Sequence, residues 1–127
     1  MKTARILIVL VGILLPYLAR IPGALLNGSS WFTSYLGSGL DALVLLGVCN
    51  ALCWGAILAA SFTYRHARSI WFPAVLGFGF LALAHGFLDL SSGSTAAISL
   101  IFIPIFSLPL VIVGWLAGLL YDRRLSR

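Results

Sequence analysis

The amino-acid sequence predicts an all-α integral membrane protein with four transmembrane helices in a compact bundle. Of its 127 residues, 61% are hydrophobic and only 9% are charged, whereas about a quarter of the residues in a soluble domain are charged. Four apolar stretches approach the length of about 20 residues that a helix needs to cross a bilayer. We therefore expect one domain, residues 1–127, with spans near residues 6–26, 40–63, 70–90 and 96–121.

The first span follows Lys2 and Arg5 and contains Pro16, which removes a hydrogen-bond donor from the helix. Because Ile21-Pro22-Gly23 comes next, we expect the helix to bend or end near Arg20. A basic start followed by an apolar run also describes a signal peptide, but the small residue required before a cleavage site is missing here. We therefore interpret this segment as a retained helix.

The connection after the first span contains aromatic residues at helical spacing. Trp31, Phe32, Tyr35 and Leu36 recur at intervals of three and four among Gly and Ser. Aromatic side chains with polar neighbours favour the headgroup region of a membrane. The pattern predicts a short interfacial helix in the first outer loop.

Small residues recur in two of the spans and indicate close helix packing. The second span carries four of them at intervals of four, a set that we call the small-residue ridge: Gly47, Ala51, Gly55 and Ala59. Gly114 and Gly118 form a GxxxG pair in the fourth span. Small residues let helices approach closely in lipid. The partner of the ridge is either a helix of this chain or one of another protomer.

The fourth span contains two prolines, Pro104 and Pro109. They free the carbonyls of Leu100 and Ile105 from their helical donors, and Ser107 lies between them as a substitute donor. We expect helix kinks at both positions, as at Pro16.

The distribution of charge predicts the orientation of the chain. With four spans, seven of the eight Lys and Arg residues fall on one side: Lys2, Arg5, Arg65, Arg68, Arg123, Arg124 and Arg127. Positive charge accumulates on the cytoplasmic side of membrane proteins. We therefore expect both termini in the cytoplasm and place the protein in the bacterial inner membrane.

Polar residues meet at a common depth near the outer side. Arg20, Asp41, His85 and Asp89 are the candidate polar site, and we expect Arg20 to pair with Asp41 or Asp89. Asn50 is expected to hydrogen-bond across helices. Two interpretations remain open. The group either binds a ligand, a proton or a partner segment, or it only fastens the helix ends together.

Two classes of function are consistent with these features. The first is an interaction protein without enzymatic activity, such as an accessory subunit, an assembly factor or a toxin-immunity-type protein. The alternative is a small oligomeric transporter or channel with an outward-facing polar site. No catalytic motif or metal-ligand spacing is present, and we expect no cofactor. The expected partners are the lipid bilayer and another membrane protein or a second copy, and not nucleic acid, because the basic residues flank apolar runs.

Overall fold

The computed structural model describes residues 1–36, 40–91 and 96–127, apart from the side chains of residues 36, 40–43, 96 and 97. The described part of the chain is helical, with short connections. The elements are α1 (Lys2–Leu18), α2 (Ile21–Asn27), α3 (Ser30–Leu36), α4 (Leu40–Ser61), the 3-10 helix η1 (Ala67–Ile70), α5 (Trp71–Phe87) and α6 (Ala96–Leu125).

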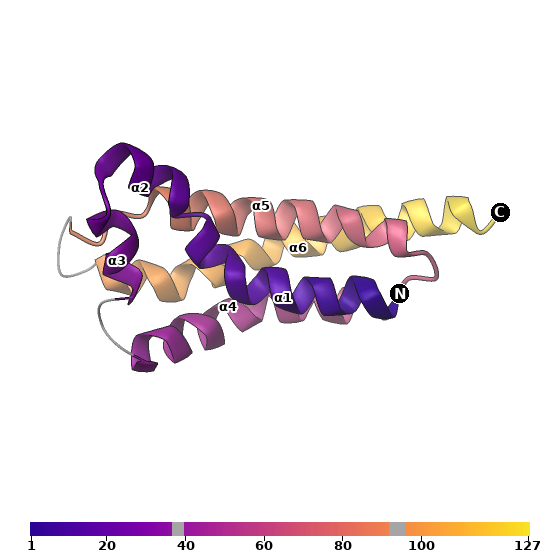
Figure 1. The fold of residues 1–127 in the computed structure, drawn as a ribbon. Coiled ribbons are helices and arrows are strands. Elements are labelled where there is room, and N and C mark those ends of the chain that lie inside the picture. The colour runs from indigo at the N-terminus through magenta and orange to yellow at the C-terminus, as the bar shows by residue number, and fades with distance from the viewer. Residues whose placement is uncertain (37–39, 92–95) are drawn as a thin grey trace.

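Four long helices, α1, α4, α5 and α6, run side by side (Figure 1). Helix α6 packs against α4 and α5, and α1 packs against the same two helices. Both chain termini lie at one end of the bundle, which we call the terminal end, together with the connection between α4 and α5 (Figure 1). Helices α2 and α3 lie at the opposite end, which we call the distal end.

The prediction of four helices long and apolar enough to cross a membrane is confirmed within the described residues. These segments are Lys2–Asn27, Val44–Ser61, Ala67–Phe87 and Ile98–Leu125. Their ends differ from the predicted ones: α1 begins at Lys2 rather than residue 6, and α4 ends at Ser61 rather than residue 63. Helix α5 stops at Phe87 rather than near residue 90, and α6 continues to Leu125 rather than residue 121.

The first span breaks close to the predicted place. Helix α1 ends at Leu18, and α2 begins at Ile21 with Pro22 in its first turn, where a missing N–H donor has little effect. Pro16 lies inside α1 and does not end it. The break therefore places Arg20 at the corner between the two helices.

A short helix, α3, forms where the aromatic spacing predicts one. Its interfacial position remains a prediction. One side of α3 faces the interior of the bundle, because the Tyr35 side chain is buried, with 4% of its surface exposed.

Helix α6 is continuous through Pro104 and Pro109. The Ser107 hydroxyl is buried and donates to the carbonyl of Pro104 at 2.6 Å. This partner differs from the predicted carbonyls of Leu100 and Ile105, because a serine on a helix reaches the carbonyl three residues before it more directly.

Glycines mediate the closest helix contacts in the bundle. A Cβ atom added at Gly114 would lie 2.5 Å from the Cα atom of Pro73, and one at Gly118 would lie 2.7 Å from the carbonyl oxygen of Ser69. Gly77 of α5 faces Val111 of α6 in the same way. The GxxxG pair of α6 therefore lies directly against η1 and the start of α5.

We expect Gly114→Ala to destabilise the protein by roughly 1 to 3 kcal/mol, because the added methyl group would meet backbone atoms that cannot move aside cheaply. The measurement is the free energy of unfolding in detergent. Gly79→Ala is the matched control, since a Cβ atom there meets nothing within 4 Å. Equal stability of the two variants would contradict this description of the α5–α6 contact.

Candidate functional site

Arg20 is buried at the distal end, with 1% of its surface exposed. Its Nε donates to the carbonyl of Trp31 at 2.6 Å, and Nη1 donates to the carbonyls of His85 at 3.0 Å and Leu88 at 2.8 Å. Nη2 donates to the hydroxyl of Ser34 at 3.3 Å. One guanidinium group therefore joins the α1–α2 corner to α3 and to the end of α5.

The carbonyls of α5 that Arg20 binds belong to the end of that helix. Leu88 adopts an extended conformation, which ends the helix at Phe87. The last carbonyls of a helix lack intrahelical donors and carry partial negative charge. Arg20 supplies both the donors and a positive charge. Its guanidinium carbon also lies 4.0 Å from the centre of the Tyr35 ring, which gives a cation–π contact.

The pairing of Arg20 with Asp41 or Asp89 stays a prediction. Among the described residues, the hydrogen bonds of Arg20 go to carbonyl and hydroxyl oxygens. Asp89 lies beyond the end of α5, where it accepts bonds from the Ser91 hydroxyl at 2.6 Å and the Ser91 N–H at 2.9 Å. These bonds lower the pKa of Asp89, and the charge of Arg20 lowers it further. The side chain of Asp41 lies outside the described residues.

His85 connects α3 to α4 through both of its ring nitrogens. Nδ1 lies 2.8 Å from the Tyr35 hydroxyl, and Nε2 lies 3.1 Å from Oδ1 of Asn50. Because Oδ1 is an acceptor, Nε2 carries the proton in this arrangement, and Nδ1 accepts from the tyrosine hydroxyl. Burial raises the pKa of Tyr35 to about 12, so its hydroxyl keeps its proton at neutral pH. Asn50 thus makes the expected hydrogen bond across helices.

We call Arg20, Tyr35, His85 and Asn50 the distal polar cluster. Tyr35 is 4% exposed, and the other three are at most 1% exposed. Toward the terminal end, the cluster is followed by a layer of buried apolar side chains from α4, α5 and α6, namely Ile57, Leu81 and Val111. The cluster is therefore packed and separated from the terminal end. Its hydrogen bonds join the α1–α2 corner, α3, α4 and α5.

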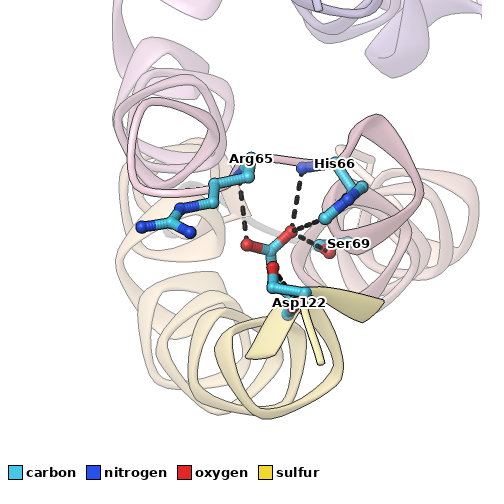
Figure 2. Close-up of polar contacts among 5 residues, drawn as sticks. Arg65, His66, Ser69 and Asp122 are labelled. Carbon is cyan, nitrogen blue, oxygen red and sulfur yellow. Dashed lines mark hydrogen bonds and ion pairs between the residues drawn. The ribbon is translucent and has the colours of Figure 1, made fainter. Parts of the chain in front are cut away.

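A second buried polar group lies at the terminal end, where Asp122 of α6 holds the connection between α4 and α5 (Figure 2). Its carboxylate accepts the backbone N–H of Arg65 at 3.0 Å and that of His66 at 2.9 Å. It also accepts the Ser69 hydroxyl at 2.8 Å and lies 3.2 Å from Nδ1 of His66. The carboxylate therefore fixes the basic turn by its backbone, and the Arg65 side chain points away from it (Figure 2).

The sequence does not predict the contact of Tyr35 with His85 or that of Asp122 with the α4–α5 connection. The sequence pattern groups Tyr35 with interfacial aromatics, and no spacing rule links it to His85, fifty residues later. Asp122 carries a clearer sequence signal. Asp122 is the one acidic residue on the side of the membrane where the basic turn of residues 64–69 is predicted, so it is a natural acceptor for that turn.

The small-residue ridge of α4 faces away from the bundle. A Cβ atom added at Gly47 or Gly55 would meet no atom within 4 Å. The residues beside the ridge are exposed as well, with Val44 at 60% and Val48 at 65%. The buried side of α4, with Asn50, lies on the opposite part of the helix. Within the described part of the chain, no helix therefore packs against Gly47 or Gly55.

Comparisons with protein-family models, with curated proteins and with solved structures find no match to this chain. In residues 1–36, 40–91 and 96–127, no group of three or more His, Cys, Asp or Glu side chains is placed to hold a metal ion. The inference of function consequently depends on the geometry of the helices and their surfaces.

Proposed function

We propose that this chain is an integral membrane protein that acts by binding another membrane protein within the bilayer, as an accessory subunit, an assembly factor or a toxin-immunity-type protein. The observation that carries the proposal is the open small-residue ridge of α4, which is suited to helix contact and has no described helix on its two glycines. No enzymatic step is part of the proposed role.

The proposed membrane insertion is supported by the distribution of apolar and polar side chains. Large apolar residues on the long helices are exposed, including Ile6 at 60%, Leu83 at 62% and Leu120 at 63%, while Arg20 and His85 are buried. Water-soluble proteins rarely expose so much contiguous apolar surface, whereas lipid solvates it. The placement of the chain in a bacterial inner membrane is supported by its small size and short connections.

The proposed orientation puts the terminal end in the cytoplasm. Seven of the eight basic residues belong to the start of α1, the α4–α5 connection, η1, and the end of α6 with the residues after it, all at the terminal end (Figure 1). Arg20, the eighth, is at the distal end. This asymmetry follows the positive-inside distribution.

The ridge fits a transmembrane helix of a partner. Glycines that face a neighbour inside this bundle, such as Gly77 and Gly114, are in close contact with side chains or backbone. Gly47 and Gly55 have the same residue type and an unoccupied face. Because helices in lipid associate through close packing, an open glycine face on an apolar helix favours association with a further helix.

The transporter alternative receives less support from the geometry. A transport path requires polar groups or water to continue through the membrane. Here the distal polar cluster is followed by Ile57, Leu81 and Val111, which are at most 2% exposed. The described polar groups at the two ends are thus separated by packed apolar side chains.

The test is Gly55→Leu, which we expect to abolish association with the partner and to leave folding unchanged, since a Cβ atom added there meets nothing within 4 Å. The measurement is crosslinking in membranes followed by copurification, together with the thermal stability of the purified chain. Gly79→Leu on α5 is the matched control, because that position is also open. Association that survives Gly55→Leu would refute the role of the ridge.

A further inference from the structure

An apolar groove lies on the outer surface between α1 and α5, in the terminal half of the bundle. It has a volume of about 710 Å³, and its walls include Ala4, Ile8 and Val11 of α1 and Ala74 and Gly79 of α5. At a rise of about 1.5 Å per residue, these walls are roughly 8 to 11 Å long. One leaflet of a bilayer core is about 15 Å thick, half of the total. The groove therefore extends over much of the depth of one leaflet.

A basic pocket adjoins the groove at the terminal end. This pocket has a volume of about 450 Å³ and is lined by Arg65, His66 and Leu125 among others. Ala67 and Arg68 line both the pocket and the groove, so the two share a wall. The apolar groove therefore adjoins a pocket that has two arginines, Arg65 and Arg68, among its lining residues.

The nearby Asp122 carboxylate contacts the backbone of the turn and the His66 ring rather than the Arg65 side chain. Asp122 binds the backbone N–H groups of Arg65 and His66 and the hydroxyl of Ser69. The side chain of Arg65 points away from it (Figure 2). Arg65 and Arg68 are both exposed.

We propose that this combined site binds one anionic phospholipid, with an acyl chain in the groove and the phosphate headgroup at Arg65 and Arg68. Apolar and basic surfaces in this order match an amphiphile with a negative headgroup, and basic pockets at the cytoplasmic ends of helices are known to bind such headgroups. Trp71, which is 69% exposed and also lines the groove, lies at the depth favoured by interfacial aromatics. The proposal depends on the membrane insertion proposed above, but not on the ridge of α4.

The experiment is native mass spectrometry of the chain released from nanodiscs that contain equal amounts of phosphatidylglycerol and phosphatidylcholine. We expect one phosphatidylglycerol to be retained per chain. The double variant Arg65→Gln, Arg68→Gln should lower the preference for the anionic lipid at least fivefold, since a basic residue near the surface contributes about fivefold. Gly79→Leu should lower lipid retention with both arginines intact, because its side chain enters the groove.

The matched control is Arg123→Gln, Arg124→Gln, which removes the same charge from exposed positions of α6. Equal losses in the two double variants would overturn the proposal in favour of a general surface potential. Equal retention of the two lipids would overturn it as well. So would displacement of the lipid by soluble glycerophosphoglycerol at equal concentration, because that result would make the site a phosphate site. Gly55→Leu should leave lipid retention unchanged, so this test is separate from that of the ridge.

Discussion

Replacing Arg20 by Leu should lower the free energy of unfolding by roughly 3 to 5 kcal/mol, a larger loss than we expect for Gly114→Ala or Asp122→Ala. The substitution removes the donors that Arg20 supplies to the buried carbonyl of His85 and to the partly buried carbonyls of Trp31 and Leu88, and a buried polar group without a partner costs about 1 to 3 kcal/mol. The measurement is the free energy of unfolding in detergent by titration with sodium dodecyl sulfate.

Two further variants make the Arg20 result specific. Arg20→Lys should recover only part of the lost stability. An ammonium group cannot donate at the same time to the carbonyls on α3 and at the end of α5, as the planar guanidinium group does. Arg124→Gln, at an exposed position of α6, should change stability by less than about 0.5 kcal/mol. If Arg20→Leu is as stable as Arg124→Gln, the distal polar cluster does not fasten the helices.

Replacing Asp122 by Ala should free the connection between α4 and α5 and cost about 2 kcal/mol. The carboxylate accepts the N–H groups of Arg65 and His66, and without it these amides have no acceptor on α6. We therefore expect their hydrogen exchange to accelerate at least tenfold. Asp122→Asn, which keeps one acceptor oxygen, should show a smaller effect. Unchanged exchange of both amides in Asp122→Ala would contradict the structure of this turn.

The four long helices could be predicted because their signal is local. Composition and the length of apolar runs determine whether a segment can form a helix that spans a bilayer, and neither needs knowledge of the neighbours. The break near Arg20 was also local, since Pro22 lies two residues after Arg20. The end of α5 was not predictable in this way, because the carbonyls of His85 and Leu88 accept hydrogen bonds from Arg20 at the distant α1–α2 corner.

The candidate site could be predicted only in part. The common depth of Arg20 and His85 follows from counting residues along two spans, and the structure brings these residues together. The carbonyl partners of Arg20 did not follow, because the sequence shows which charges are present but not which backbone carbonyls lie nearby. A buried guanidinium can equally be satisfied by backbone carbonyls, whose positions exist only in the folded chain. The contact between Tyr35 and His85 was not predicted either, because it also depends on positions that exist only in the folded chain.

The small-residue ridge shows both the strength and the limit of sequence reasoning. Its spacing predicts close packing but does not name the partner. The structure shows that Gly47 and Gly55 have open faces, while Gly114 and Gly118 are packed. This contrast within one chain is the basis for proposing that the ridge binds a helix from outside it.

The proposal that the small-residue ridge binds a helix of another membrane protein is tested most directly by photo-crosslinking. One crosslinking residue is placed at Val48, which is 65% exposed beside the ridge, and the control is placed at Val75, which is 58% exposed on α5. In native membranes, we expect Val48 to give one discrete protein adduct that Gly55→Leu removes, and Val75 to give none of it. The absence of a protein adduct at Val48, or the same adduct at both positions, would contradict the claim.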